Sequence, residues 1–206
     1  MFTIENKTIL ALAPHIDDVE LGAGATIHRL AQRNKVFYVG MSCPPDTERD
    51  VFMKEFRVSI THLGIDPARL LLRDYDPRNL SDSRSEILQF LFDLNTKLRP
   101  DVVLMPNSRD THQSHEVVFA EARRAFKHST MLGYERPWNS FDFAMDVFVE
   151  LDAANVQAKL AAINSYATQR HRTFFSNDIV GDLARVRGQQ VGREYAECFE
   201  MIRLLL

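Results

Sequence analysis

The sequence has few of the features that mark secreted or membrane-spanning proteins. Its 206 residues include only two cysteines, Cys43 and Cys198, which are too few for a disulfide framework and do not form a CxxC pair. No apolar run approaches the roughly 18 residues of a transmembrane helix, and the first ten residues lack the basic head of a signal peptide. These absences predict a cytoplasmic protein with no membrane span and no thiol-based zinc site.

The charged residues show no surplus that points to a polyanion as partner. There are 25 lysines and arginines against 28 aspartates and glutamates, a formal net charge of −3, and neither sign gathers in a tail. Nucleic acids and anionic lipids are therefore not expected as partners. With 45% hydrophobic residues and no low-complexity tract, linker or internal repeat, the chain is expected to fold as a single domain over residues 1–206.

Strand-like and helix-like segments alternate along the chain. Short apolar runs predict strands at 8–13, 36–41, 70–72, 101–105, 131–135 and 147–151. Helical spacing of apolar residues predicts helices at 18–33, 48–63, 116–126, 153–166 and 186–206, and a further helix that starts from Ser81 as N-cap and ends before Pro100. These repeated units predict an α/β fold, a Rossmann-like three-layer sandwich with a mostly parallel sheet and helices on both faces.

Two polar clusters follow predicted strands, and in open parallel sheets ligands bind beyond the carboxyl ends of the strands. The first cluster, residues 14–18 (PHIDD), comes directly after the first strand and contains His15, Asp17 and Asp18. The second follows the fourth strand and contains His112 and His115, which share one face if this stretch forms a helical turn; its other polar members are Asn107, Asp110 and Ser114. The first and fourth strands can be neighbours, which would bring both clusters to one crevice.

These residue types suit a catalytic zinc, which usually has three nitrogen or oxygen ligands from the protein and leaves a fourth position to water. His15, Asp18 and His115 would supply the three ligands. Asp17, beside a ligand but free of the metal, would accept a proton from water, and a protonated His112 would stabilise the developing oxyanion. The two clusters together therefore predict a catalytic metal centre.

Simpler interpretations exist for several of these residues. A His-x-Asp-Asp run can cap the next helix, since aspartate interacts favourably with a helix N-terminus. The small residues 22–25 (GAGA) are a weak match to a dinucleotide-binding loop, but they follow the predicted helix start, so close helix–sheet packing is the preferred interpretation. The remaining histidines lack a partner at metal-ligand spacing and are interpreted as surface or packing residues: His28, His62, His128 and His171.

With these residues in place, the chain resembles the LmbE-like, or PIG-L, family of zinc-dependent N-deacetylases. Residues 13–26 (APHIDDVELGAGAT) resemble the family's opening pattern, in which a strand ends in Pro-His-Pro-Asp-Asp-Glu and a Gly-rich helix start follows. Residues 110–115 (DTHQSH) resemble its second signature, His-x-Asp-His. Weaker similarities extend over the rest of the chain, at Glu55, 134–138 (YERPW), Lys159, Tyr166, Gln169, 187–188 and 195–199 (YAECF).

The resemblance implies hydrolysis of an acetamide on a small N-acetylglucosaminyl or related amino-sugar compound. It implies His15, Asp18 and His115 as zinc ligands, Asp17 as general base and His112 as the imidazole that assists the tetrahedral intermediate. Iron, cobalt or nickel would also suit a site of two histidines and one aspartate. Relatives often assemble into homo-oligomers, so the resemblance also implies that this chain can bind further copies of itself.

The sequence departs from the family pattern at several positions in its first half. Ile16 replaces a proline, and Val19 stands where a glutamate is common, although Glu20 follows directly. An arginine that the family tends to place in the next helix is replaced by Phe52, with Arg49 as the nearest arginine. None of these changes removes one of the three expected metal ligands.

The second signature carries one further departure. Ser114 stands where many members have an aspartate that orients the catalytic imidazole. A serine can hydrogen-bond to a ring nitrogen but cannot stabilise an imidazolium by charge, and Asp110 is the candidate to compensate. Three alternatives therefore stay open: a deacylase of a non-sugar amide, a family member that binds metal or sugar without turnover, and a nucleotide-binding Rossmann-type protein.

Overall fold

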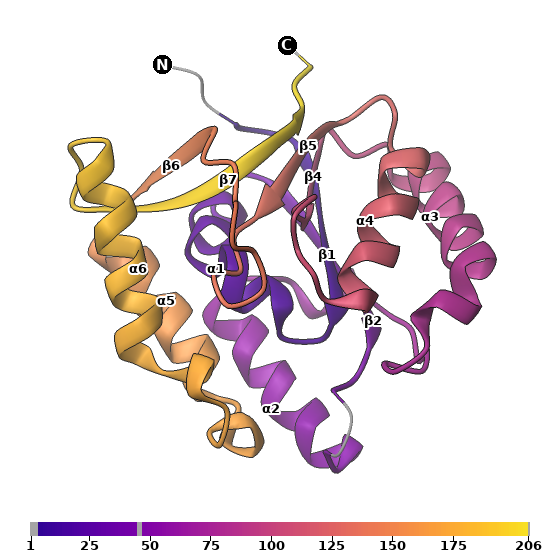
Figure 1. Ribbon diagram of the computed structural model, residues 1–206, viewed down its shortest axis with the longest axis horizontal. Coiled ribbons are helices and arrows are strands. Elements are labelled where there is room, and N and C mark those ends of the chain that lie inside the picture. The colour runs from indigo at the N-terminus through magenta and orange to yellow at the C-terminus, as the bar shows by residue number, and fades with distance from the viewer. Residues whose placement is uncertain (1–3, 45–46, 206) are drawn as a thin grey trace.

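The chain builds one sheet with helices packed against it (Figure 1). The computed structural model describes residues 4–44 and 47–205, except for the side chain of Asn177. Within this part of the chain, seven strands are ordered β3-β2-β1-β4-β5-β7-β6. The strands are β1 (Thr8–His15), β2 (Lys35–Ser42), β3 (Leu70–Leu72), β4 (Val102–Pro106), β5 (Thr130–Tyr134), β6 (Val147–Leu151) and β7 (Tyr195–Arg203). The helices are α1 (Asp18–Ala31), α2 (Arg49–His62), α3 (Arg84–Leu98), α4 (Gln113–Ala125), α5 (Ala153–Asn164) and α6 (Asn177–Gln190).

The sheet is parallel over most of its width and antiparallel at one edge. β1 pairs in parallel with β2 and with β4, β2 pairs in parallel with β3, and β4 with β5. β7 runs antiparallel to both of its neighbours, β5 and β6. The predicted α/β fold with a mostly parallel sheet is therefore confirmed. The first and fourth strands are neighbours, as the proximity of the two polar clusters requires.

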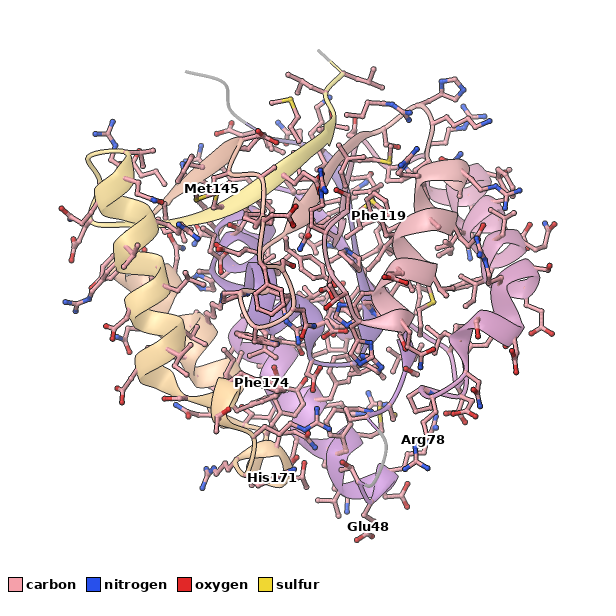
Figure 2. All side chains as sticks on the ribbon, viewed as in Figure 1. Glu48, Arg78, Phe119, Met145, His171 and Phe174 are labelled. Atoms are coloured by element: carbon pink, nitrogen blue, oxygen red, sulfur yellow. The ribbon has the colours of Figure 1, made fainter. Side chains whose placement is uncertain are left out.

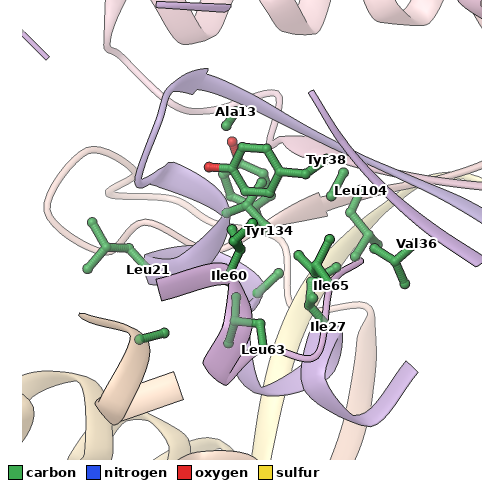
Figure 3. Packing of buried hydrophobic residues seen from close by; sticks show 14 of the residues in the cluster. Ala13, Leu21, Ile27, Val36, Tyr38, Ile60, Leu63, Ile65, Leu104 and Tyr134 are labelled. Atoms are coloured by element: carbon green, nitrogen blue, oxygen red, sulfur yellow. The ribbon is translucent and has the colours of Figure 1, made fainter. Parts of the chain in front are cut away.

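Helices cover both faces of the sheet because successive side chains of a strand point to opposite faces. On one face, Ile9 and Ala11 of β1 are fully buried in a cluster with residues of α1, α2 and α5 (Figure 3). On the other face, Leu10 and Leu12 are buried against α3 and α4, where Phe119 packs at the edge (Figure 2). Among the helices of residues 4–44 and 47–205, none combines the length and the hydropathy that a bilayer crossing requires.

The C-terminal region differs from its prediction. A helix was expected over 186–206, but α6 ends at Gln190 and the chain returns as strand β7. Gly192 has φ +67°, a left-handed conformation that glycine adopts readily and that ends the helical path. The helix prediction is wrong for β7 because the first five residues of this strand are all buried, so they lack the alternation that marks a strand with one exposed face.

Two predicted helix starts also shift. Ser81 does not cap α3; it lies in a 3-10 turn, Leu80–Ser83, which is anchored by the buried Leu80, and α3 begins after this turn. The helix expected from 116 begins three residues earlier, at Gln113, with His112 as its N-cap. The second shift matters for function, because it places His112 at a fixed position directly before the first turn of α4.

Small residues let α1 approach its neighbours, as predicted for the 22–25 stretch. A Cβ atom on Gly22 would lie 2.5 Å from Cδ2 of the Tyr134 ring, and one on Gly24 would lie 3.0 Å from Cγ of Lys159. Real Cβ atoms do not come as close as the first of these distances, so Gly22 is required by the contact between α1 and β5. The interpretation of these residues as packing residues is confirmed.

A buried carboxylate from β7 completes α1. The helix is kinked at Ala23, which has φ −142° and ψ 15° and therefore leaves backbone N–H groups after it without helical partners. Glu197 accepts hydrogen bonds from the N–H groups of Ala25 (3.2 Å) and Thr26 (2.7 Å). The Lys159 ammonium lies 2.6 Å from the same carboxylate and supplies the opposite charge that a buried anion needs.

Candidate active site

The adjacent ends of β1 and β4 bring the two polar clusters into one cavity of about 560 Å³. His15 is the last residue of β1 and Asp18 the first of α1, while His112 and His115 lie at the start of α4. All five residues singled out from the sequence line this cavity, including Asp17. The cavity also contains Phe174, from the segment before α6, and Arg78, from the loop before α3, both labelled in Figure 2.

Nitrogen and oxygen atoms from both clusters converge at distances that suit a divalent metal. Oδ2 of Asp18 lies 3.1 Å from Nε2 of His115 and 3.3 Å from Nδ1 of His15. Ligand atoms of one tetrahedral zinc lie about 3.3–3.6 Å apart, given bonds of about 2.0–2.2 Å. One nitrogen each of His15, His112 and His115 also falls within 4.8 Å of the others. The donor set therefore fits a metal ion. The three ligands that the sequence predicts, His15, Asp18 and His115, are referred to as the metal centre, and His112 belongs with His15 and His115 to the histidine group that could also hold an ion.

A second carboxylate fixes the orientation of His115. Nδ1 of this ring lies 2.6 Å from Oδ2 of Asp110, so Nδ1–H donates to the carboxylate and Nε2 is directed towards Asp18. Burial would lower the pKa of His115, but the charge of Asp18 and hydrogen bonds to Asp110 and Asp18 raise it to about 9. The surroundings of His115 thus favour a positive charge at this point, which a bound metal ion would also supply.

Asp18 is held in its ionised form. Its carboxylate accepts a hydrogen bond from the backbone N–H of His15 (2.7 Å) and another from the guanidinium of the buried Arg136. Burial acts to raise the pKa of Asp18, but the charges of His115 and Arg136 outweigh it and hold the pKa well below its usual range. Arg136 in turn lies over the ring of Trp138, with 4.8 Å from its guanidinium carbon to the ring centroid.

Asp17 differs from Asp18 because one of its carboxylate oxygens has no hydrogen-bond partner among the described residues. This oxygen is Oδ2, and the side chain is buried. Burial and the charge of Asp18 raise its pKa well above the usual value. The backbone at Asp17 has φ 154° and ψ −16°, outside the regions that residues with a side chain favour. A strained turn therefore places a carboxylate that can carry a proton beside the metal centre.

His112 presents one ring nitrogen to the cavity. Its Nδ1 accepts a hydrogen bond from the backbone N–H of Ser114 (3.3 Å), so in the neutral ring the hydrogen is on Nε2. Burial, and then the charges of His115 and His15, lower the pKa of His112 to about 4. These surroundings favour the neutral ring, in which Nε2–H is a donor. The protonated His112 expected from the sequence stays a prediction.

The two residues expected to orient His112 have other partners. The Ser114 hydroxyl donates to the carbonyl of Pro77 (3.0 Å), and only its backbone N–H reaches the His112 ring. Asp110 was expected to compensate for the serine, but it binds His115 instead. The reason is local geometry: Asp110 precedes the helix, and its other oxygen accepts from the N–H of His112 (2.9 Å), which closes the loop onto His115.

The remaining departures from the family pattern lie away from the cavity lining. Phe52 is fully buried and stacks on Tyr166, with 5.2 Å between ring centroids. Arg49 forms an ion pair with Asp74 on the surface. Glu20 is buried and accepts hydrogen bonds from three hydroxyls, those of Tyr38 (2.8 Å), Tyr166 (2.5 Å) and Ser59 (3.3 Å). It therefore ties α1 to β2, α2 and the segment after α5, and does not enter the site.

The sequence patterns missed several cavity residues, among them Arg172 and Phe174. Both lie in irregular segments between α5 and α6, where neither helical nor strand spacing marks a functional position. Arg136 and Trp138 lie within the 134–138 stretch that carried a weak family similarity, which was the available signal for them. Glu55, a second weak similarity, accepts hydrogen bonds from Thr168 and so anchors the segment that carries Arg172.

Comparison with known proteins identifies the family. A family model described as PIG-L, GlcNAc-PI de-N-acetylase, matches residues 10–126, more than half of the chain. The chain belongs to the PIG-L family. Both polar clusters lie inside the matched range, so the residues that form the metal centre are part of the segment that defines membership. The PIG-L proteins are metal-dependent deacetylases, and the convergence of His15, His112 and His115 agrees with that property.

Individual PIG-L relatives and solved structures extend the similarity beyond the matched range. The uncharacterized deacetylase YaiS of Escherichia coli K12 is 27% identical over 176 residues, which cover 79% of this chain and 91% of YaiS. The crystal structure of the conserved protein TT1542 from Thermus thermophilus has a TM-score of 0.81 at 24% identity and covers 97% of this chain and 96% of its own.

Two solved structures of assigned activity share the fold. GalB, the 4-carboxy-2-hydroxymuconate hydratase from Pseudomonas putida KT2440, gives a TM-score of 0.78 at 18% identity and covers 97% of this chain and 98% of its own. The N,N'-diacetylchitobiose deacetylase from Pyrococcus horikoshii gives 0.71 at 21% identity, covering 95% of this chain and 84% of its own. The same fold thus occurs in a deacetylase and in a hydratase, so the fold alone does not determine the reaction.

Proposed function

We propose that the protein is a zinc-dependent hydrolase that removes the N-acetyl group from a small N-acetylglucosaminyl-type amino-sugar compound. One observation carries the proposal: Asp17 has an unpartnered, buried carboxylate oxygen beside two imidazoles and a second carboxylate that converge at metal-ligand distances. This is the set of groups that amide hydrolysis by an activated water requires. Family membership supports the same reaction class.

The metal would be held by Nδ1 of His15, Oδ2 of Asp18 and Nε2 of His115. When bound, it polarises the amide carbonyl and lowers the pKa of a water molecule to about 7. Two nitrogen donors and one oxygen donor suit zinc, and they would also accept iron, cobalt or nickel. Asp110 fixes the His115 tautomer through Nδ1, which leaves Nε2 free to act as the ligand.

Two side chains outside the metal centre would move or stabilise charge. Asp17 accepts a proton from water while the water oxygen attacks the acetamide carbon. Asp17 then gives a proton to the amine nitrogen as the carbon–nitrogen bond breaks. A carboxyl with a raised pKa suits a group that must hold this proton between the two steps. His112 donates from Nε2–H to the oxyanion, a role that a neutral imidazole can fill.

The proposal is tested with metal-loaded protein and three groups of compounds: N-acetylglucosamine and its glycosides, N-acetylated amines without a sugar, and unsaturated carboxylic acids. Release of free amine from the sugars alone is the expected result. Amine release from the non-sugar amides alone would show that the substrate is not an amino sugar. Addition of water to an unsaturated acid, without any amine release, would show that the protein is a hydratase and not a deacetylase.

A second candidate is a protein that binds metal and sugar without turnover. The position of Ser114 favours it, because no carboxylate of the described residues hydrogen-bonds to the His112 ring. Stoichiometric metal, together with sugar binding and no product from any acetamide, would support this candidate over the first. Dependence of any measured activity on His112 would argue for the enzyme.

We propose that residues 1–206 act as one domain, supported by the insertion of β7 between β5 and β6 of the same sheet. A cytoplasmic location is likewise proposed, supported by the free thiols of Cys43 and Cys198. Fractionation of cells that express a tagged full-length chain would test the location.

A further inference from the structure

One wall of the cavity consists of two stacked aromatic rings between two arginines. The guanidinium carbon of Arg136 lies 4.8 Å from the centroid of the Trp138 ring. Trp138 stacks on Phe174, with 4.9 Å between centroids and 13° between planes. The guanidinium carbon of Arg172 lies 5.9 Å from the Phe174 centroid. We call these four residues, which all line the cavity, the arginine–aromatic wall.

One cation of the cavity lining is not used by the proposed reaction. Arg136 is engaged by Asp18, whereas Arg172, which also lines the cavity, forms no ion pair within residues 4–44 and 47–205. A divalent ion at the metal centre would add further positive charge. The acetamide group itself is neutral, so it cannot compensate this charge.

The backbone that carries Arg172 is fixed from two directions. The N–H and hydroxyl of Thr168 donate to the Glu55 carboxylate of α2, at 3.1 and 2.6 Å. The N–H of Arg172 donates to the carbonyl of Gln169 (3.0 Å), whose own side chain is fully buried. Stacking on Phe174 then restricts the guanidinium. A cation held in this way has already lost part of the conformational entropy that ligand binding would otherwise cost.

Arg172 lines the same cavity as Asp17. Burial and the charge of Asp18 raise the pKa of Asp17, and the charge of Arg172 is among those that act to lower it. A substrate whose acetamide reaches Asp17 would bring its neighbouring substituents to Arg172.

We propose that Arg172 is a specificity-determining residue that binds an anionic substituent of the amino-sugar substrate, a carboxylate or a phosphate. This inference rests on the proposed function. Guanidinium groups pair with both anions through two parallel hydrogen bonds. The stacked rings of Trp138 and Phe174 would lie beside the sugar between this anion and the metal centre. The substrate is thus an N-acetylated amino sugar with negative charge.

The first test compares kcat/KM for three acetylated sugars in the metal-loaded protein. N-acetylglucosamine is neutral, N-acetylglucosamine 6-phosphate carries a phosphate, and N-acetylmuramic acid carries a carboxylate. We expect at least one charged substrate to be preferred by about ten- to a hundred-fold, as suits a charge-assisted hydrogen bond. The Arg172→Gln variant should lose this preference, so that the ratio of kcat/KM for the charged over the neutral sugar falls to about one.

Two variants separate anion binding from other effects of the wall. Arg170→Gln removes a nearby exposed arginine whose guanidinium bonds to the Asn164 carbonyl (3.4 Å) and does not line the cavity as described, so it should keep the preference. Arg172→Lys retains the charge without the planar pair of donors, and should recover part of the preference. An equal loss on neutral and charged substrates in Arg172→Gln would overturn the proposal, because it would show that Arg172 acts only through Asp17 or through packing.

A binding experiment distinguishes failure of this inference from failure of the proposed function. Trp138 is the only tryptophan of the chain and belongs to the wall, so its fluorescence reports ligands there. Glucosamine 6-phosphate should bind more tightly than glucosamine to the wild type, and Arg172→Gln should abolish the difference, even if no acetamide is hydrolysed. Equal affinities in the wild type, or a difference retained in the variant, as expected for phosphate on the metal, would overturn the inference.

Discussion

The metal centre and the arginine–aromatic wall line the same cavity but are held by different forces. Every carboxylate and imidazole of the metal centre is buried and bound to a charged or polar neighbour, as in the contact of Asp110 with His115. In the wall, Trp138, Phe174 and Arg172 are only half-buried and meet through stacked faces. Electrostatic networks fix atoms more tightly than stacked surfaces do, so the centre is suited to chemistry and the wall to selection among substrates.

The largest effect is expected from a substitution that removes proton transfer but leaves metal binding unchanged. Asp17→Asn keeps the size of the side chain but removes the proton acceptor, so the rate of acetamide hydrolysis should fall by about 10²- to 10⁴-fold. Metal content, measured by elemental analysis, should stay at the wild-type level because Asp17 is not a proposed ligand. A variant that deacetylates normally would remove Asp17 from the role of general base.

The next effect concerns the residue that supports a ligand. Asp110→Asn weakens the acceptor for Nδ1–H of His115, so metal affinity should fall by about 10- to 100-fold in competition with a chelator. Asp142→Asn is the matched control, because Asp142 forms an exposed ion pair with Arg109 (3.2 Å). Unchanged affinity in Asp110→Asn would show that the imidazole is oriented by packing alone.

Changes in the wall should act on substrate binding and leave the centre intact. Phe174→Leu removes the stacked ring between Trp138 and Arg172, a contact worth about 0.5–1.5 kcal/mol. KM should rise by about two- to twelve-fold, with kcat and metal content nearly constant. A fall in kcat with unchanged KM would mean that the wall takes part in the chemical step, and the contrast between the two regions would fail.

The smallest effect lies outside both regions and serves as a reference. Burial acts to raise the pKa of Asp101, but hydrogen bonds from the Thr8 N–H (2.8 Å) and Lys7 (3.1 Å) lower it below its usual value. An acid whose pKa is lower in the folded state stabilises the fold above its unfolded pKa, and this contribution is lost as the pH falls. Asp101→Asn should therefore cost less than about 1 kcal/mol at pH 7, and the cost should be smaller at low pH.

Urea unfolding at pH 7 and at about pH 3, near the unfolded pKa of an aspartate, measures this difference, and hydrolysis by the same variant should equal that of the wild type. Asp101 precedes β4, at the end of the strand opposite to the cavity. The same loss of stability at both pH values would show that Asp101 acts by hydrogen bonding that does not depend on its charge.

Local patterns in the sequence predicted the parts of the site that depend on local structure. His15 and Asp18 flank a tight turn after β1, and His112 and His115 lie around the first turn of α4, so short spacings were enough to group them. Their meeting depends on β1 and β4 being neighbours, which the order of strand and helix segments also indicated. The fold class followed from the same alternation.

Tertiary contacts decided what these patterns could not. Asp110 was assigned to the wrong imidazole because its partner depends on the path of a loop. Arg172 joins the cavity through an irregular segment, without any period to reveal it. The error at β7 has a similar origin, since a strand buried on both faces shows no alternation in its first residues.

The hydrogen bonds between Glu197 and the kinked part of α1 have a practical consequence for anyone who expresses fragments of this chain. The carboxylate that accepts from the N–H groups of α1 lies in β7, well beyond residue 126, where the family match ends. A fragment trimmed to the matched range would lack both Glu197 and Lys159, so the amide groups of Ala25 and Thr26 would lose their acceptor. Expression libraries, split reporters and chimeras should therefore keep both ends of the chain together.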